Sequence, residues 1–211
     1  MSAAQAIADA LVSAERERKP IVPFTRAQPF LSTGTAYEAQ SLFVGHRLAG
    51  GERVVGAKLG MTSKVKRAAL GIGEPVYGRL TSGMIHPFGE PLRLDELIHP
   101  SAEPEIAFLL GRRIDAFTTL AGVMAATELV FPALEVVDSR YGERFRQPDS
   151  IADNAGAARV VLGAQGRSPR ELVDLHVLGC LFRWQGGSST AAGGVRRLVR
   201  GDAHRHFRLE L

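Results

Sequence analysis

The chain has 211 residues, of which 45% are hydrophobic and 23% are charged, and its formal net charge is +4. These values are typical of a globular protein with one core, and no apolar run approaches the ~18 residues of a membrane span. The first twenty residues lack the apolar segment of a signal peptide, and a single cysteine excludes an internal disulfide. We therefore expect one cytoplasmic domain, residues 1–211, with no membrane partner.

The excess positive charge lies near the end of the chain. It comes from a cluster of arginines with two histidines among them: Arg196, Arg197, Arg200, Arg205 and Arg208, with His204 and His206. No recognisable nucleic-acid-reading module or interleaved aromatic residue accompanies the cluster, so we expect no nucleic-acid partner. An anionic substrate explains a basic balance equally well.

The first part of the chain predicts two helices. Ser2–Lys19 has apolar residues at helical spacing, with Ser2 as the expected N-cap. Thr35–Leu48 has the same pattern, and the glycine pair Gly50–Gly51 provides the C-terminal stop. Residues 1–52 are therefore expected to form an N-terminal helical region.

A β-type segment follows, Arg53–Leu59, and it contains a lysine at position 58. Lys58 in an apolar strand either extends to the rim of the core or serves an anion. A turn leads to a short helix that ends at Leu70. The segment Val76–Met84 contains two glycines. It is either a plain hairpin region or a place where the backbone approaches a ligand closely.

The most informative stretch is Pro100–Leu110, whose second half has the apolar composition of a buried strand. Before that half stand Glu103 and Glu105, and a spacing of two residues places both carboxylates on one face of an extended chain. A second apolar strand, Phe131–Asp138, is interrupted by Glu135. Three carboxylates on two strands suit a hard divalent ion such as Mg²⁺ or Mn²⁺. Alternatively, the first two glutamates flank a solvated loop and the third pairs with an arginine.

Pro104 lies between the two neighbouring glutamates. Proline has no backbone N–H to donate to a strand ladder, so it is tolerated at a sheet edge or a bulge. We therefore expect this strand to be an edge strand or to bulge at Pro104.

The rest of the chain predicts a helix over Thr118–Leu129 and strands over Arg159–Gly163 and Leu175–Trp184. Between them, Asp153–Asn154 are residue types that favour turns. Residues 53–184 thus form an expected β-rich core, followed by an atypical basic tail over residues 185–211. No P-loop, CxxC or HExxH motif is present.

Several of these segments together resemble one family, the hydratase/decarboxylase branch of the fumarylacetoacetate hydrolase superfamily. The matching segments are Gly56–Ser63, Pro75–Gly78, Glu103–Phe108, Ala133–Arg140 and Ala152–Ala155, in the right order and spacing between about Thr35 and Leu181. The resemblance implies an α+β fold, a mixed β-roll with an N-terminal helical region. Members of the family run several tens of residues further, so the C-terminal part is expected to be shortened.

The resemblance also implies the roles of individual residues. Glu103, Glu105 and Glu135 match the ligands of Mg²⁺ or Mn²⁺, and Lys58 matches the active-site lysine. Asp138 and Arg140 are further catalytic candidates. The substrate-binding candidates are Tyr77, Arg79, Thr81, Ser82, Asp153 and Asn154. Four of these residues, Asp138, Arg140, Asp153 and Asn154, are also explained as structural turns and ion pairs.

The activity implied is metal-dependent decarboxylation of the 2-oxo acid 2-oxo-3-hexenedioate to 2-hydroxypenta-2,4-dienoate in aromatic meta-cleavage catabolism. The alternative is a hydratase acting on 2-hydroxypenta-2,4-dienoate. Hydratases of this branch commonly carry an acidic residue just before the methionine matching Met84, whereas Gly83 stands there in this chain, which favours the decarboxylase. A third hypothesis is a truncated, non-catalytic relative that acts as a partner subunit. A homo-oligomer, or a complex with a homologous hydratase or decarboxylase, is the expected assembly.

Overall fold

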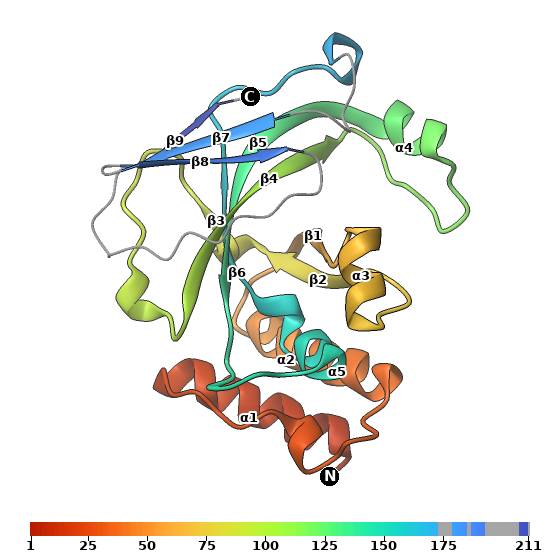
Figure 1. Cartoon of the computed structure of the whole chain (residues 1–211), viewed down its shortest axis with the longest axis vertical. Helices are drawn as coiled ribbons and strands as arrows, with labels where there is room; N and C mark the ends of the chain where they lie inside the picture. The colour runs from red at the N-terminus through yellow and green to blue at the C-terminus, as the bar shows by residue number, and fades with distance from the viewer. Residues whose placement is uncertain (173–178, 185–186, 193–206, 211) are drawn as a thin grey trace. The chain divides into compact units, whose positions relative to one another are not determined.

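The computed structural model has an α+β fold (Figure 1) and describes residues 1–172, 179–184, 187–192 and 207–210. The described residues fall into two compact units. Unit 1 comprises Met1–Ile85, Arg93–Ser101 and Val136–Arg159. Unit 2 comprises His86–Leu92, Ala102–Glu135 and the described residues from Val160 onward.

Two helices begin unit 1. Helix α1 spans Ala3–Glu17, and the hydroxyl of Ser2 accepts a hydrogen bond from the Gln5 N–H, which confirms the predicted N-cap. Helix α2 spans Thr33–Ala49, within two residues of the prediction, and ends at Gly50. The two helices pack against each other through an apolar core that includes Ile7, Leu11 and Phe43.

A two-stranded antiparallel ribbon completes the part of unit 1 that concerns the site. Strand β1 spans Val54–Gly60 and strand β2 spans Val76–Thr81, with the short helix α3, Lys64–Leu70, between them. Helix α5, Gln147–Ala152, follows later in the chain and packs against α2. The single-turn 3₁₀ helices of the described chain are η1 (Phe24–Arg26), η2 (Ser82–Met84), η3 (Leu94–Glu96), η4 (Asn154–Gly156) and η5 (Pro169–Glu171).

A four-stranded sheet has the strand order β3, β6, β5, β4. Its strands are β3 (Ile85–His86), β4 (Pro100–Leu110), β5 (Thr127–Asp138) and β6 (Ala157–Leu162). Strand β4 is therefore an edge strand, which is one of the two places where a proline such as Pro104 is tolerated. The prediction that its apolar end is buried is wrong, because Phe108, Leu109 and Leu110 are each nearly half exposed.

The helix predicted over Thr118–Leu129 is shorter in the structure. Helix α4 spans Leu120–Ala126, capped by the Thr119 hydroxyl, and the residues from Thr127 onward belong to β5. The helical prediction is thus wrong for residues 127–129. Thr127 and Val130, three residues apart, lie on opposite faces of the strand and are both buried, so the strand is covered on both faces here rather than on one.

A three-stranded antiparallel sheet has the order β8, β7, β9, with strands Gly187–Ala192, Gly179–Trp184 and Phe207–Glu210 respectively. Strand β7 confirms the second half of the strand predicted over Leu175–Trp184, and positions 175–178 lie outside the described residues. Two of these strands fall in the segment that was predicted to be an atypical tail. Among the described residues, no helix is both long enough and apolar enough to cross a membrane.

The side chain of Gln40 connects three elements of unit 1. It is fully buried in α2, and its Nε2 donates to the carbonyl oxygens of Tyr77 in β2, at 2.9 Å, and Ile151 in α5, at 2.8 Å. No strand of the described part of the chain pairs with β2 on this side, so the amide supplies one of the bonds that a further strand would provide.

We expect Gln40→Leu to lower the free energy of unfolding by about 2–4 kcal/mol, because it leaves two buried carbonyls without a donor. Urea denaturation followed by circular dichroism measures the loss. The control is Glu38→Ala, an exposed position of the same helix, which should change the free energy by no more than ~0.5 kcal/mol. Equal effects of both substitutions would contradict this role for Gln40.

Candidate active site

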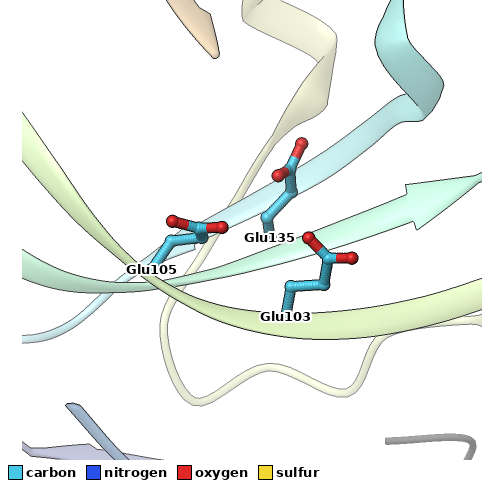
Figure 2. Close-up of side chains that lie close together, drawn as sticks. All are labelled: Glu103, Glu105 and Glu135. Atoms are coloured by element: carbon cyan, nitrogen blue, oxygen red, sulfur yellow. The ribbon is translucent and has the colours of Figure 1, made fainter. Parts of the chain in front are cut away.

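The three predicted glutamates lie together in unit 2. Glu103 and Glu105 come from one face of β4, and Glu135 comes from the neighbouring strand β5. One carboxylate oxygen from each lies within 4.8 Å of those of the other two, and Figure 2 shows the three side chains close to one another. Glu103 and Glu135 are buried, whereas Glu105 is half-buried. The alternative in which the first two glutamates flank a loop is wrong, because both lie inside a strand.

The chemistry of this donor set fits a hard divalent cation. Carboxylate oxygens are the ligands that Mg²⁺ and Mn²⁺ prefer, and three carboxylates in such a small space repel one another unless a cation or proton is shared. Two oxygens bound at the usual metal–oxygen distance of about 2.0–2.2 Å are at most about 4.4 Å apart, so oxygens within 4.8 Å of one another need only a small side-chain movement to reach a common centre. The cluster is therefore a candidate metal centre.

Lys58 lies in unit 1, on strand β1, and is only 9% exposed. Its Nζ donates a hydrogen bond of 3.0 Å to the carbonyl oxygen of Ala155 in η4. Burial of an ammonium group is costly unless it is hydrogen-bonded, so this contact helps to keep the charge inside the unit. Of the two sequence alternatives for the lysine, extension to the rim is wrong.

Asp138, Arg140 and Asp153 form a buried cluster in unit 1. The Asp138 carboxylate accepts hydrogen bonds from the N–H groups of Ile98 and His99, at 2.6–3.1 Å. Arg140 is fully buried, and its Nε lies 2.7 Å from Asp153 Oδ1 while Nη1 donates to the Asp138 carbonyl oxygen. These contacts are the structural ion pairs and turns that the sequence left open as an alternative.

The charges of this cluster affect one another. Burial disfavours the charged guanidinium, but Asp153, followed by Glu15 and Asp138, outweighs burial and raises the pKa of Arg140. For the Asp153 carboxyl, burial disfavours the charged form and raises the pKa, whereas the positive charge of Arg140 lowers it. We take the pair as ionised, because protonating Asp153 would leave a buried arginine without its nearest counter-charge.

Asn154 contacts the main chain of β2. Its Oδ1 accepts from the Arg79 N–H at 2.7 Å, and its Nδ2 donates to the Arg79 carbonyl oxygen at 2.9 Å. Both functional groups of the amide are therefore engaged within the protein.

The remaining predicted substrate contacts do not share one face of the ribbon. Lys58 is opposite Gly78 in the register of the two strands, so Tyr77 and Arg79, one residue to either side, lie on the other face. Tyr77 is 40% exposed and stacks on Tyr37 with ring centroids 4.5 Å apart. Within unit 1, the structure therefore does not place Tyr77 and Arg79 on the face that carries Lys58.

Thr81 is buried at the end of β2, and Ser82 begins η2. The Ser82 hydroxyl accepts from the Arg53 N–H at 3.2 Å, and the Ser82 N–H donates to the Arg53 carbonyl oxygen at 2.9 Å. Ser82 therefore joins this segment to the start of β1.

Sequence reasoning missed Glu52, which contacts the same segment. Its Oε2 accepts from the Gly83 N–H at 3.1 Å, and a Cβ built on Gly83 would lie 2.7 Å from its carboxylate. The segment before Met84 is therefore neutral in its own side chains but has a carboxylate against it. Nothing in the spacing of positions 52 and 83 indicates this contact, because the chain between them folds into the ribbon and α3.

Comparison with known proteins defines the class to which this fold and these residues belong. The chain belongs to the hydratase/decarboxylase branch of the fumarylacetoacetate hydrolase superfamily, as the sequence motifs predicted. No family model matches the chain.

Some of the similar proteins are named hydratases and others are named decarboxylases. The chain is 41% identical over 193 residues to a 2-hydroxypent-2,4-dienoate hydratase from Pseudomonas putida, covering 90% of this chain and 86% of that protein. It is 40% identical over 172 residues to a 4-oxalocrotonate decarboxylase from Pseudomonas sp, covering 78% of this chain and 66% of that protein. A solved structure of 4-oxalocrotonate decarboxylase from Pseudomonas putida G7, complexed with magnesium and adipate, matches with a TM-score of 0.84 and 32% identity. That match covers 90% of this chain and 73% of that one.

We expect Mg²⁺ or Mn²⁺ to raise the free energy of unfolding by about 2.7 kcal/mol at a concentration one hundred times the dissociation constant, because the ion binds the folded cluster. Glu135→Gln should remove this stabilisation. Thermal denaturation at increasing metal concentration measures both.

The matched control is Glu128→Gln, which changes an exposed glutamate of the same strand outside the cluster. This variant should keep the full effect of the metal. Equal stabilisation of the two variants would mean that the ion binds elsewhere.

We also expect Arg140→Met to lower the free energy of unfolding by about 3–5 kcal/mol, since it leaves Asp153 as a buried charge without its guanidinium. Chemical denaturation gives the value. Arg144→Met, at an exposed position, is the control and should stay within ~0.5 kcal/mol. A loss below about 1 kcal/mol for Arg140→Met would rule out a structural role for the pair.

Proposed function

We propose that the protein is a divalent-metal-dependent lyase that decarboxylates 2-oxo-3-hexenedioate to 2-hydroxypenta-2,4-dienoate. The observation that carries the proposal is the cluster of Glu103, Glu105 and Glu135, whose oxygens lie within 4.8 Å of one another. A relative named as a decarboxylase and a matched structure complexed with magnesium support it.

The glutamates would hold Mg²⁺ or Mn²⁺ through their carboxylate oxygens. When bound, the ion supplies Lewis-acid polarisation of the substrate's 2-oxo carbonyl. Glu103 and Glu135 are buried and Glu105 is half-buried, and electrostatic interactions are stronger where water is excluded.

Lys58 is the proposed catalytic cation. Its ammonium group would hold the anionic oxygens of the substrate or donate a proton to the 2-oxygen, which becomes the hydroxyl group of the product after the carboxylate leaves as CO₂. Asp138 and Arg140 would act with it by fixing the main chain around residues 138–140. This assignment follows the family resemblance and the contacts within unit 1.

Substrate binding by Tyr77, Arg79, Thr81, Ser82, Asp153 and Asn154 remains part of the proposal. Tyr77 is the most accessible of them at 40% exposed, and it offers a hydroxyl group to a carboxylate. Asp153 and Asn154 would contribute through the main chain that they hold in place, since their side chains bond within the protein.

A hydratase acting on 2-hydroxypenta-2,4-dienoate is the second candidate. The hydratase relative at 41% identity supports it, and so does the Glu52 carboxylate against Gly83. A negative charge at that place would disfavour a substrate with a second carboxylate if it faced the distal end of the substrate. Arg47 lies 3.4 Å from Glu52 and offsets part of that charge.

We further propose that residues 1–211 belong to one catalytic domain of the β-roll type, and that the protein is cytoplasmic. A homo-oligomer, or a complex with a homologous hydratase or decarboxylase, is supported by the edge strand β4, which leaves Phe108, Leu109 and Leu110 nearly half exposed.

The test is turnover of the two substrates in parallel. With Mg²⁺ or Mn²⁺ present, the protein should release CO₂ from 2-oxo-3-hexenedioate at least tenfold faster than it hydrates 2-hydroxypenta-2,4-dienoate, where the loss of diene absorbance follows hydration. Glu105→Gln should lower the rate at least about 100-fold, because it weakens the metal site. Glu128→Gln should retain it.

The opposite preference would make the protein a hydratase with the same metal site. Metal-dependent stabilisation without turnover of either substrate would leave the third hypothesis, a non-catalytic partner subunit. Turnover that chelators do not affect would contradict both enzymatic proposals.

A further inference from the structure

The main chain around Ala155 has an unusual conformation. Asn154, Ala155 and Gly156 have φ angles of 52°, 53° and 72°, so three consecutive residues occupy the left-handed region. Glycine enters this region freely and asparagine tolerates it, but alanine does so only under strain. Strained residues persist where the surrounding structure holds them, and they often mark functional segments.

The side chain of Asn154 connects this turn to strand β2. Its amide makes two hydrogen bonds, of 2.7 and 2.9 Å, to the N–H and carbonyl groups of Arg79. Among the described strands, β2 pairs with β1 alone, so the main-chain groups on its other side are available to a side chain. The turn is thereby held at the free edge of β2, next to Gly78.

Gly78 provides the space that the turn occupies. A Cβ built on it would lie 2.3 Å from the Asn154 carbonyl oxygen, so no larger residue fits without moving the main chain. Gly78 is also the register partner of Lys58, which places their side-chain positions on the same face of the ribbon. The turn therefore lies on the face that carries the lysine.

The lysine reaches the turn across this face. Its Nζ donates to the Ala155 carbonyl oxygen at 3.0 Å, and a Cβ built on Gly60, two residues further along β1, would lie 3.9 Å from the same nitrogen. That distance is an ordinary van der Waals contact, so position 60 lies beside the ammonium group. The space for the turn itself comes from Gly78.

We propose that the left-handed turn Asn154–Gly156 is a positioning device for the Lys58 ammonium group, with Asn154 as the positioning residue. This inference rests on the proposed function of Lys58. The strained conformation directs the Ala155 carbonyl oxygen toward the ribbon, where it accepts one of the lysine's hydrogen bonds and sets the position of the nitrogen. The proposed contribution of Asn154 to substrate binding through the main chain is in this way exerted on the lysine.

The experiment uses a signal that does not depend on turnover. The chain contains four lysines, at positions 19, 58, 64 and 66, so selective ¹³C-lysine labelling gives four side-chain signals. Lys58→Arg identifies the signal of Lys58. In Asn154→Ala we expect this signal to move by more than its line width, while kcat falls about 10- to 100-fold and KM stays within about threefold.

Gly78→Ala should have the same effect as Asn154→Ala, because the added methyl group displaces the turn. Its matched control is Gly45→Ala, where a Cβ meets nothing within 4 Å, and both the signal and kcat should stay as in the original protein. Asn154→Asp keeps the acceptor for the Arg79 N–H and loses the donor. This variant should displace the Lys58 signal by an intermediate amount. If Asn154→Ala does not fold, Asn154→Asp tests whether Asn154 positions the lysine.

A Lys58 signal that stays in place, with kcat within about twofold, in folded Asn154→Ala and Gly78→Ala would overturn the proposal. A displaced signal in a protein that turns over neither substrate would support the positioning and contradict the proposed function. The two failures are therefore distinguishable.

Discussion

Repulsion among three carboxylates is the constraint on which the candidate active site depends. Glu103, Glu105 and Glu135 bring oxygens within 4.8 Å of one another, and two of the side chains are buried. Ionised groups so close together, and removed from water, favour a shared cation. The arrangement follows from two simple features: the two-residue period of β4 and the adjacency of β4 and β5 in the sheet. The edge position of β4 lets proline stand between the first two glutamates without the loss of an inner ladder bond.

In unit 1, polar side chains satisfy the main-chain groups of the two-stranded ribbon that carries Lys58. Strand β2 has β1 on one side only, and Gln40 and Asn154 bind the main-chain groups on its other side. These bonds join α2, the end of α5 and the ribbon around Lys58. The buried Arg140–Asp153 pair holds the chain just after β5 to the residue that precedes the turn. A buried ion pair of this kind is strongly destabilising when one partner is removed, so it fixes the conformation of the segment.

Decarboxylation and hydration place the same demand on the metal centre. Both use a polarised 2-oxo carbonyl, which is consistent with relatives of the two names occurring in one family, at 41% and 40% identity to this chain. The difference lies at the distal end of the substrate, where only the decarboxylase accepts a second carboxylate. Glu52 weakens the argument for a decarboxylase that rests on the neutral segment before Met84. Its carboxylate brings a negative charge to that segment, which has no acidic side chain of its own. Local sequence neutrality is therefore an incomplete guide to local electrostatics.

The amino-acid sequence by itself determined the helices α1 and α2, the strands that carry the glutamates and the family. Periodicity, caps and closely spaced motifs are local, and the structure keeps them with small changes at element ends. Only the tertiary structure decided that β4 exposes its apolar end, that Lys58 bonds to the Ala155 carbonyl and that Asn154 binds the main chain of β2. These contacts join residues 75 to 97 positions apart, or depend on which strand lies at the edge of a sheet. Their partners are set by packing between distant segments, which no local pattern of residues encodes.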